Sequence, residues 1–463
     1  MFFNLLPSSI RKYFQMSKRQ RQHELRLTLW RTPFFYIIAT LILAALVLFL
    51  DVWLGLASYT NKFFRADFQT TRLLISALIG GILTLAAFTL NSLLVVLTTF
   101  SGQFSPRMLQ NFVKDKQTQH ILGIFNGSFV FILIMFLFIS SHPVNNFVAV
   151  PLSVAGIAFI NILTFIYFIN HATAWMQVHN ITDGMKKVSE NIIQGSLKRD
   201  LEDYRTEEPG DLMRAYQAHI KMVNAPNSGY VQLINFYDLV EEAKRDNIII
   251  KVETRVGSFI LKDNVLFSYW GPNAEDINVE KYVRMINIGH KETEIQDLKL
   301  TMNKLSEIAI KALGNDDPKT ATNTIHQLAD LLLTVDNNIT FTPYLADNNN
   351  QVRLIVGIED FDYYLYQGFG TIRHYAQKNY PIIIELIGAL VSLSKSIDPS
   401  RHDNLWRFSK NTLDHIYTEF IFDLDRSLLL EKMYDLAEVT GNLEEYKGIE
   451  KHLASNAIND LPC

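Results

Sequence analysis

The sequence predicts an α-helical membrane bundle of four spans, followed by a soluble α+β cytoplasmic domain. Two observations lead to this prediction. Long runs without a charged residue are confined to the first 180 residues, whereas the rest of the chain has the mixed composition of a soluble protein. The length of 463 residues also exceeds one typical domain of ~100–200 residues. We therefore expect at least two folding units.

The composition divides the chain into five expected segments, because charge and hydrophobicity change along it. They are a basic cytoplasmic segment (1–32), a four-helix transmembrane domain (33–175), an exit helix and linker (176–228), a small β-rich module (229–290) and a mainly helical cytoplasmic domain (291–463).

The N-terminal segment is strongly basic. Residues 1–32 hold seven Lys and Arg and one acid, Glu24, whereas the whole chain has a formal net charge of −4. A basic segment beside an apolar run favours contact with anionic lipid headgroups. The acidic remainder lacks a basic face with interleaved aromatic residues, so we expect no nucleic-acid partner.

Four uncharged runs are the expected spans. Each is about as long as the ~20 residues that cross the core of a bilayer, and none contains Asp, Glu, Lys or Arg. The first begins too late and is too long for a cleaved signal peptide. The runs are Pro33–Leu50, Leu73–Thr99, Ile121–Ile139 and Phe147–Ile169.

The orientation of the spans follows from the basic residues of the short loops. The loop after the second span and the segment after the fourth lie on the same side as the basic N-terminus, and both are basic. The opposite side holds Lys62 and Arg65, offset by Asp67. Both termini are therefore expected in the cytoplasm. The basic residues of that side are Arg107, Lys114, Lys116, Lys186 and Lys187.

Small and polar residues within the spans indicate how the helices associate. Gly123 and Gly127 form a GxxxG pattern, which allows close packing either within one bundle or between subunits of a homo-oligomer. Asn91, Asn126 and Asn161 either join helices by hydrogen bonds or line a water-filled path. Since carboxylates are missing from the runs, an active proton-coupled pump is disfavoured, whereas a passive pore is not.

The loop between the second and third spans reads Gln103-Phe104-Ser105-Pro106-Arg107-Met108-Leu109. This loop resembles the central signature of an uncharacterised bacterial membrane-protein family, domain of unknown function 2254. Further similarities are Gly229-Tyr230-Val231-Gln232, Val256-Gly257-Ser258-Phe259, and the run from Ile308 to Ala321. The resemblance implies four spans and a soluble C-terminal region in the bacterial inner membrane, and it implies no reaction.

Considered by its residues alone, the same loop has two interpretations. Ser105 followed by Pro106 is typical of a helix start, with Ser as the N-cap. Arg107 would then meet lipid phosphates at the membrane surface. Alternatively, Arg107 is a fixed charge at a pore mouth or an anion site.

Helical spacing continues beyond the fourth span, from Ala172 to Ile193. His171, Trp175 and His179 lie four residues apart and share one face. A pair of His residues at this spacing can bind zinc, but no third ligand is nearby. An interfacial face at the membrane exit is the favoured interpretation.

The β-rich module begins at Gly229. Asn247–Glu253 forms one expected strand, and Ser258–Leu261 pairs with Val265–Tyr269 across Lys262–Asn264 as a hairpin. Gly257 is expected to supply a positive φ or a bulge.

The helical part begins with an expected capping box at Thr293–Gln296. Gly314 ends the first helix, and Asp317 with Pro318 begins the next, so that the string Asn315–Pro318 is the turn of an αα-hairpin. The alternative is a cation or ligand site formed by acids and a histidine. Its residues would be His290, Asp297, Asp316 and Asp317. Further helices are expected around residues 359–395 and 402–452.

No catalytic motif is recognisable in the sequence. It contains no G-x-S-x-G, HExxH, P-loop or G-x-G-x-x-G fingerprint, and its one cysteine is the last residue, Cys463. A disulfide within the chain and a Cys-based metal cluster are therefore impossible, in agreement with a reducing cytosol. We expect no catalytic residues, no metal and no cofactor.

Two functions remain. The first is an oligomeric channel or passive transport protein with a cytoplasmic regulatory domain. It draws on the GxxxG pattern, the intramembrane Asn residues and the basic loop. The second is a membrane-anchored sensor or scaffold whose soluble domain binds a ligand or protein partner. It draws on the size of the soluble part. The sequence slightly favours the channel, and the partner of the soluble domain is not identified.

Overall fold

The computed structural model describes residue 21 and residues 31–103, 115–141, 146–175, 177–198, 201–208, 219–376, 379–414 and 422–459. The chain divides into an N-terminal unit, Met1–Val178, and a C-terminal unit, His179–Cys463.

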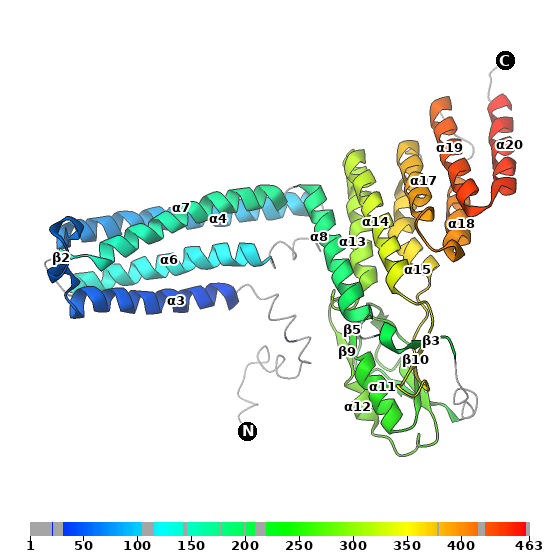
Figure 1. Ribbon diagram of the computed structural model, residues 1–463, viewed down its shortest axis with the longest axis horizontal. Helices are drawn as coiled ribbons and strands as arrows, with labels where there is room; N and C mark the ends of the chain where they lie inside the picture. The colour runs from blue at the N-terminus through cyan, green and yellow to red at the C-terminus, as the bar shows by residue number, and fades with distance from the viewer. Residues whose placement is uncertain are drawn as a thin grey trace. The chain divides into compact units, whose positions relative to one another are not determined.

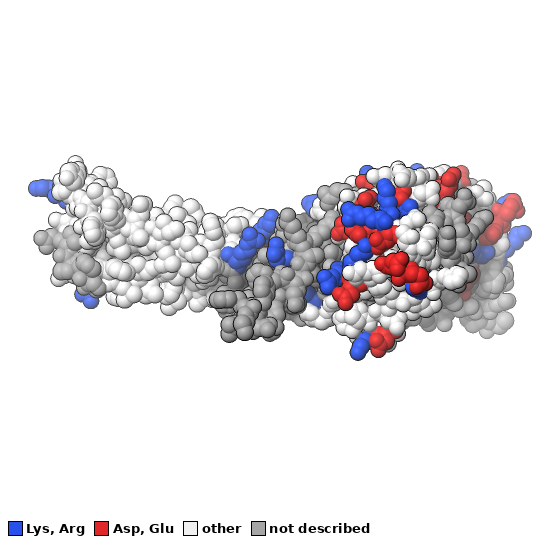
Figure 2. Space-filling model, turned by 90° about the horizontal axis from the view of Figure 1, so that it is seen from below, with Lys and Arg blue, Asp and Glu red and all other residues white. Residues whose placement is uncertain are grey.

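Four long helices make up most of the described part of the N-terminal unit. Each is long and apolar enough to cross a membrane, which confirms the four predicted runs. Helix α6 packs against the other three, and α4 also packs against α7 (Figure 1). In Figure 2, the visible face of this unit is free of charged side chains between its ends. The helices are α3 (Arg31–Leu48), α4 (Phe68–Gln103), α6 (Lys116–Ser141) and α7 (Ala149–Trp175).

A cluster of apolar side chains lies inside the four-helix unit. All four helices contribute to one cluster, in which Phe131, Ile132 and Met135 of α6 are fully enclosed. Its other members include Val47 of α3, Ile75 of α4 and Val154 of α7. Close packing of this kind is the normal way in which helices associate in lipid.

A buried acid fixes one end of this unit. Asp51 lies in a π-helical turn, Phe49–Trp53, directly after α3, and is 1% exposed. Its carboxylate accepts hydrogen bonds from the backbone N–H groups of Val148, Ala149 and Val150, at 2.8–3.2 Å. These donors begin α7 and have no partner within the helix. Asp51 therefore caps α7 from a distant part of the chain.

The GxxxG glycines pack inside the bundle. A Cβ on Gly123 would lie 2.5 Å from the ring of Tyr36, and a Cβ on Gly127 would lie 3.0 Å from Thr40. Both neighbours belong to α3. By contrast, Gly80 and Gly81 of α4 have no described atom within 4 Å of that position. The two pairs of glycines therefore differ sharply in the space around them.

This difference predicts the effect of single methyl groups. We expect Gly123→Ala to destabilise the bundle by about 2 kcal/mol, because the added methyl forces the Tyr36 ring aside. Gly80→Ala, the matched control, should leave stability unchanged or slightly raised, since alanine favours helix. Unfolding by SDS in mixed micelles measures both. Equal effects of the two substitutions would contradict this packing.

The described residues of the C-terminal unit form two β-sheets. The six-stranded sheet has the order β3-β10-β11-β6-β8-β4, in which β11 and β6 are parallel and all other neighbours are antiparallel. The three-stranded sheet, β7-β5-β9, is antiparallel. The strands are β3 (Arg205–Thr206), β4 (Lys221–Asn224), β5 (Gly229–Ile234), β6 (Ile249–Val252), β7 (Phe259–Ile260), β8 (Val265–Trp270), β9 (Ile286–Gly289), β10 (Tyr344–Ala346) and β11 (Val352–Ile355).

The sheets correct two predictions. The predicted module, 229–290, omits β3, β4, β10 and β11, which come from both sides of it in the chain. The predicted hairpin is also wrong, because β7 pairs with β5 whereas β8 pairs with β4 and β6. The turn between them, with Asp263 at φ 67°, carries the chain from one sheet to the other.

Helices surround and follow the sheets. Helices α13 and α14 form the predicted αα-hairpin, with Gly314 ending α13 and Asp317 capping α14. Helix α14 packs against α17, α17 packs against α19, and α19 packs against α20 (Figure 1). The helices are α8 (Val178–Ile192), α11 (Phe236–Arg245), α12 (Val279–Val283), α13 (Leu298–Gly314), α14 (Pro318–Asn338), α15 (Phe361–Leu365), α16 (Thr371–Ala376), α17 (Tyr380–Ser394), α18 (His402–Leu413), α19 (Asp423–Thr440) and α20 (Leu443–Asn459).

The predicted capping box at the start of α13 is wrong. Helix α13 begins at Leu298, and Asp297 is its N-cap. Thr293 donates to the carbonyl of Gln232 at 3.2 Å, and the amide of Gln296 bonds both backbone groups of Ile234 at 3.0 Å. Both side chains are therefore bonded to the backbone of β5, and Asp297 is the residue that caps α13.

Candidate functional site

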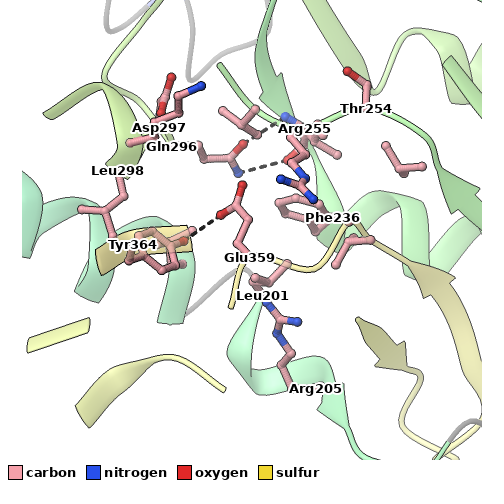
Figure 3. A pocket seen from close by; sticks show the side chains of 17 residues that line it. Leu201, Arg205, Phe236, Thr254, Arg255, Gln296, Asp297, Leu298, Glu359 and Tyr364 are labelled. Atoms are coloured by element: carbon pink, nitrogen blue, oxygen red, sulfur yellow. Dashed lines mark hydrogen bonds between the residues drawn. The ribbon is translucent and has the colours of Figure 1, made fainter. Parts of the chain in front are cut away.

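The described part of the C-terminal unit contains a cavity of about 60 Å³ at the carboxyl ends of its two parallel strands. Strand β6 leads into Thr254 and Arg255, and β11 leads into Val356 and Gly357, and all four residues line it. The carboxyl ends of parallel strands are a common place for ligands. Figure 3 shows that the N-terminus of α13 and residues of α15 complete the wall.

Both apolar and charged residues line the cavity. Leu201, Phe236 and Leu298 are among the apolar ones, together with Val252 and Val356. The charged ones are two acids and three bases. They are Asp297, Glu359, Arg205, Arg255 and Lys299.

Asp297 is the first of the two acids and is buried, with 4% of its surface exposed. One carboxyl oxygen accepts the backbone N–H of Leu300 at 2.9 Å, which caps α13. Burial raises the pKa of Asp297 to about 7, and the negative charge of Glu359 adds to the rise. A proton or a positive group is therefore favourable beside Asp297 at neutral pH.

Glu359 provides the second carboxyl. Tyr364 donates to it at 2.7 Å, as Figure 3 shows. The residue is half-buried, but its carboxyl group lies deep among protein atoms. Burial raises the pKa of Glu359 despite the Tyr364 hydrogen bond and the charges of Arg255 and Arg205. The positive charges that the protein supplies do not offset the desolvation of this carboxyl.

Two of the three bases are engaged elsewhere. The Arg205 guanidinium pairs with Glu202 at 3.3 Å. The Arg255 guanidinium lies over the ring of Tyr363, 5.4 Å from its centroid. Because both cations already have partners, they are less available to an added anion than the cavity's composition suggests.

The glycine of the Val256–Phe259 motif belongs to this site. Gly257 has φ 80°, as predicted, and a Cβ there would collide with the Asp297 carboxylate. The Ser258 hydroxyl stabilises the turn by donating a hydrogen bond to the carbonyl of Arg255 at 2.6 Å. The motif therefore allows Asp297 to approach the strand connection closely.

The predicted cytoplasmic ligand site is not formed as a group. Asp297 begins α13, whereas Asp316 and Asp317 follow its last residue. A helix of 17 residues separates them, which is about 25 Å at 1.5 Å per residue. His290 is exposed and does not line the cavity. Of the four, Asp297 alone lines the cavity. The length of α13 and the pairing of the strands decide this, and neither can be read from the spacing of the acids.

The cavity adds residues that sequence reasoning missed. Glu359, Arg205 and Tyr364 come from segments far from Asp297 in the chain. A partial signal was present, since Arg255 directly precedes the Val256–Phe259 motif. Among the residues that the structure describes, no group of three or more His, Cys, Asp or Glu residues is arranged to hold a metal ion.

The predicted residues of the spans lie in different surroundings. Asn161 is fully buried and donates to the carbonyl of Ile157 at 2.8 Å, while its side-chain oxygen has no described partner. Asn91 and Asn126 are on the outside of the described bundle. Ser105, Pro106 and Arg107 lie outside the described residues.

The predicted helix from Ala172 to Ile193 is interrupted between α7 and α8. The Nε2 atom of His171 lies 2.9 Å from a carboxyl oxygen of Asp115, and Asp115 also caps α6 through the N–H of Thr118. Trp175 packs edge-on against His171, with ring centroids 6.3 Å apart. His171 therefore helps to join α7 to the start of α6.

The four apolar helices and the mixed helical and sheet region define the class: a multi-span helical membrane protein with a large α+β unit. Residues 26–392 match the sequence profile described as "Predicted membrane protein (DUF2254)". Because the match covers most of the chain, the protein belongs to this family.

The chain is also similar to uncharacterised proteins of Mycobacterium tuberculosis and Mycobacterium bovis. The proteins of two M. tuberculosis strains and of M. bovis are each 24% identical to it over 342 residues. This alignment covers 71% of the chain and 65% of each relative's length. No solved structure matches the chain.

Proposed function

We propose that this protein is a membrane-anchored ligand-binding protein of the bacterial inner membrane. In this proposal the four spans hold the C-terminal unit in the cytoplasm, with both chain termini on that side. The cavity between β6, β11 and α13 binds a small ligand that carries a positively charged group. One observation carries the proposal: two buried carboxyls, Asp297 and Glu359, line a single cavity.

The charge of the ligand follows from the state of these carboxyls. Burial raises the pKa of both groups, so the protein stabilises their ionised forms poorly. An ammonium group beside Glu359 would supply the missing positive charge and hydrogen-bond donors. Asp297 already offsets the partial positive charge at the N-terminus of α13. The apolar residues of the lining favour an organic cation with a short aliphatic part over a bare metal ion.

The proposal assigns the cavity to binding, not to catalysis. Two acids in one cavity also occur in hydrolytic enzymes, where they act on opposite sides of a bond. Here one oxygen of Asp297 is held by the Leu300 N–H, and Glu359 accepts from Tyr364. These bonds fix the carboxyls in place, as a recognition site requires.

The channel remains the second candidate. The exposed amides Asn91 and Asn126 favour it, because polar groups on a lipid-facing surface are costly unless protein or water covers them. Since an apolar cluster from all four helices occupies the interior of one bundle, a pore would have to form between copies in a homo-oligomer. Ion flux into liposomes, with Asn126→Leu and Arg107→Ala as variants, tests this candidate. Flux that both substitutions alter would favour the channel over the proposed function.

The ligand proposal predicts selective binding of n-butylammonium. We expect full-length protein in detergent at pH 8 to bind this cation and to bind it at least tenfold more weakly after Glu359→Gln, because the charge that offsets the ammonium is removed. Glu385→Gln, an exposed acid of the same unit, is the matched control and should bind normally. Isothermal titration calorimetry measures all three proteins.

Two further probes decide the class of ligand. Butyrate has the same aliphatic part with the opposite charge, and n-butanol has no charge. Binding of butyrate that Glu359→Gln strengthens would show an anion site and overturn the proposed charge. If neither ion produces heat that depends on Glu359, the cavity does not serve as this binding site.

A further inference from the structure

The connection between the first two spans exposes large aromatic side chains. Trp53, Tyr59 and Phe63 are 81%, 85% and 87% exposed. Phe49 and Phe64, which are about half exposed, pack against two of these rings, with Phe49 stacked on Trp53 and Phe64 edge-on to Phe63. Soluble surfaces seldom present so many large apolar groups in one short segment. Something other than water is expected to cover them.

Hydrogen bonds within the segment hold this connection in shape. Arg65 donates from two nitrogens to the carbonyl of Thr60, at 2.6 and 3.0 Å. The Thr60 hydroxyl donates to the carbonyl of Leu56 at 2.8 Å. Gly55, with φ 57°, turns the chain between a π-helical turn and a short 3-10 helix, Leu56–Ser58. The aromatic side chains therefore project from an ordered connection.

The position of the connection identifies the covering partner. It joins the ends of α3 and α4, two helices that are apolar enough to cross a membrane, so the headgroup layer begins where it lies. Trp and Tyr prefer that layer because one part of the ring is apolar and another forms hydrogen bonds. Lys62, directly before Phe63, and Arg72, in the second turn of α4, are both exposed and suit lipid phosphates.

We infer that residues 53–65 form an interfacial anchor whose aromatic side chains insert into the headgroup layer of the membrane. The partner is the phospholipid surface itself. This inference concerns the N-terminal unit and is independent of the ligand proposed for the cavity.

Spin labelling tests the anchor in the intact protein. The one cysteine, Cys463, is replaced by Ser, and Phe63→Cys then carries a nitroxide in liposomes of phosphatidylethanolamine and phosphatidylglycerol. Two matched positions calibrate depth: Leu163→Cys on the outer face of α7 and Glu280→Cys in the C-terminal unit. Relaxation by oxygen reports lipid, and relaxation by a water-soluble nickel chelate reports water.

The anchor predicts a label at position 63 that is relaxed by oxygen more strongly than at position 280, with nickel access reduced at least threefold. Tyr59→Cys provides a second label, so that one poorly folded variant does not decide the result. Nickel access equal to that at position 280 would place the segment in water and overturn the inference. Low access to both reagents would show that protein covers the segment, which also overturns it.

Discussion

Asp297→Asn is expected to stabilise the protein at pH 8 and to remove its response to n-butylammonium. Asparagine retains the oxygen that caps α13 and eliminates a carboxylate that burial destabilises. A pKa raised from 3.8 to about 7 corresponds to a cost on the order of 4 kcal/mol for the ionised form. The expected gain in the free energy of unfolding is therefore about 2–4 kcal/mol.

The raised pKa of Asp297 also makes the stability of the native protein depend on pH. Below pH 4, Asp297 is neutral in both the folded and the unfolded chain, so it does not affect stability. Between pH 4 and pH 7 the unfolded chain releases the proton while the folded chain retains it, and the stability of the native protein falls. The variant should lack this decline and should equal the native protein near pH 4.

Thermal unfolding of the full-length protein measures the prediction, with the buried Trp270 and Trp406 of the C-terminal unit as fluorescent probes. Asp347→Asn is a useful contrast, because Asp347 pairs with Arg353 at 2.9 Å and its pKa is lowered through that contact, despite burial. That substitution should destabilise at pH 8. A loss of stability in Asp297→Asn would show that the carboxylate is a structural group and would weaken the proposed binding site.

Asp51→Ala is expected to destabilise the N-terminal unit by about 4 kcal/mol. The substitution leaves three N–H groups at the start of α7 without their carboxylate, and buried donors without partners cost about 1–3 kcal/mol each. In a membrane protein few alternative partners exist for such donors. The loss should appear as unfolding at a lower SDS fraction in mixed micelles.

Asp51→Asn separates the charge of this group from its shape. The amide retains one acceptor oxygen of similar size, so about half of the loss should be restored. Unaltered SDS resistance of Asp51→Ala would mean that Asp51 does not hold α3 and α7 together. The same measurement on Ser58→Ala, an exposed hydroxyl in the same connection, gives the baseline for a minor change.

The sequence was enough to predict a membrane protein, because the thickness of the bilayer sets the length of each span. Any helix that crosses the bilayer needs about 20 apolar residues, and the four runs meet this requirement without reference to their neighbours. The αα-hairpin at Gly314 and Asp317 was accessible for a similar reason. Helix caps are local hydrogen bonds between residues a few positions apart.

The predictions that were wrong depend on residues that are far apart in the chain. The hairpin expected across Lys262–Asn264 did not form, because strand pairing depends on which distant strands are available, here β4, β5 and β6. The capping box failed because Thr293 and Gln296 form hydrogen bonds with β5 instead. Local patterns are outweighed when a distant backbone segment offers the same side chain a buried partner.

The candidate site shows the same division. Asp297 was named from the sequence, but with Asp316 and Asp317, from which helix α13 separates it. Glu359 and Arg205 reach the cavity through the parallel pairing of β11 with β6 and the edge pairing of β3 with β10. The sequence alone determined the membrane class, the turn between α13 and α14 and the absence of internal disulfides. Only the tertiary structure decided which charges share one cavity, because sheet pairing joins residues more than 100 positions apart.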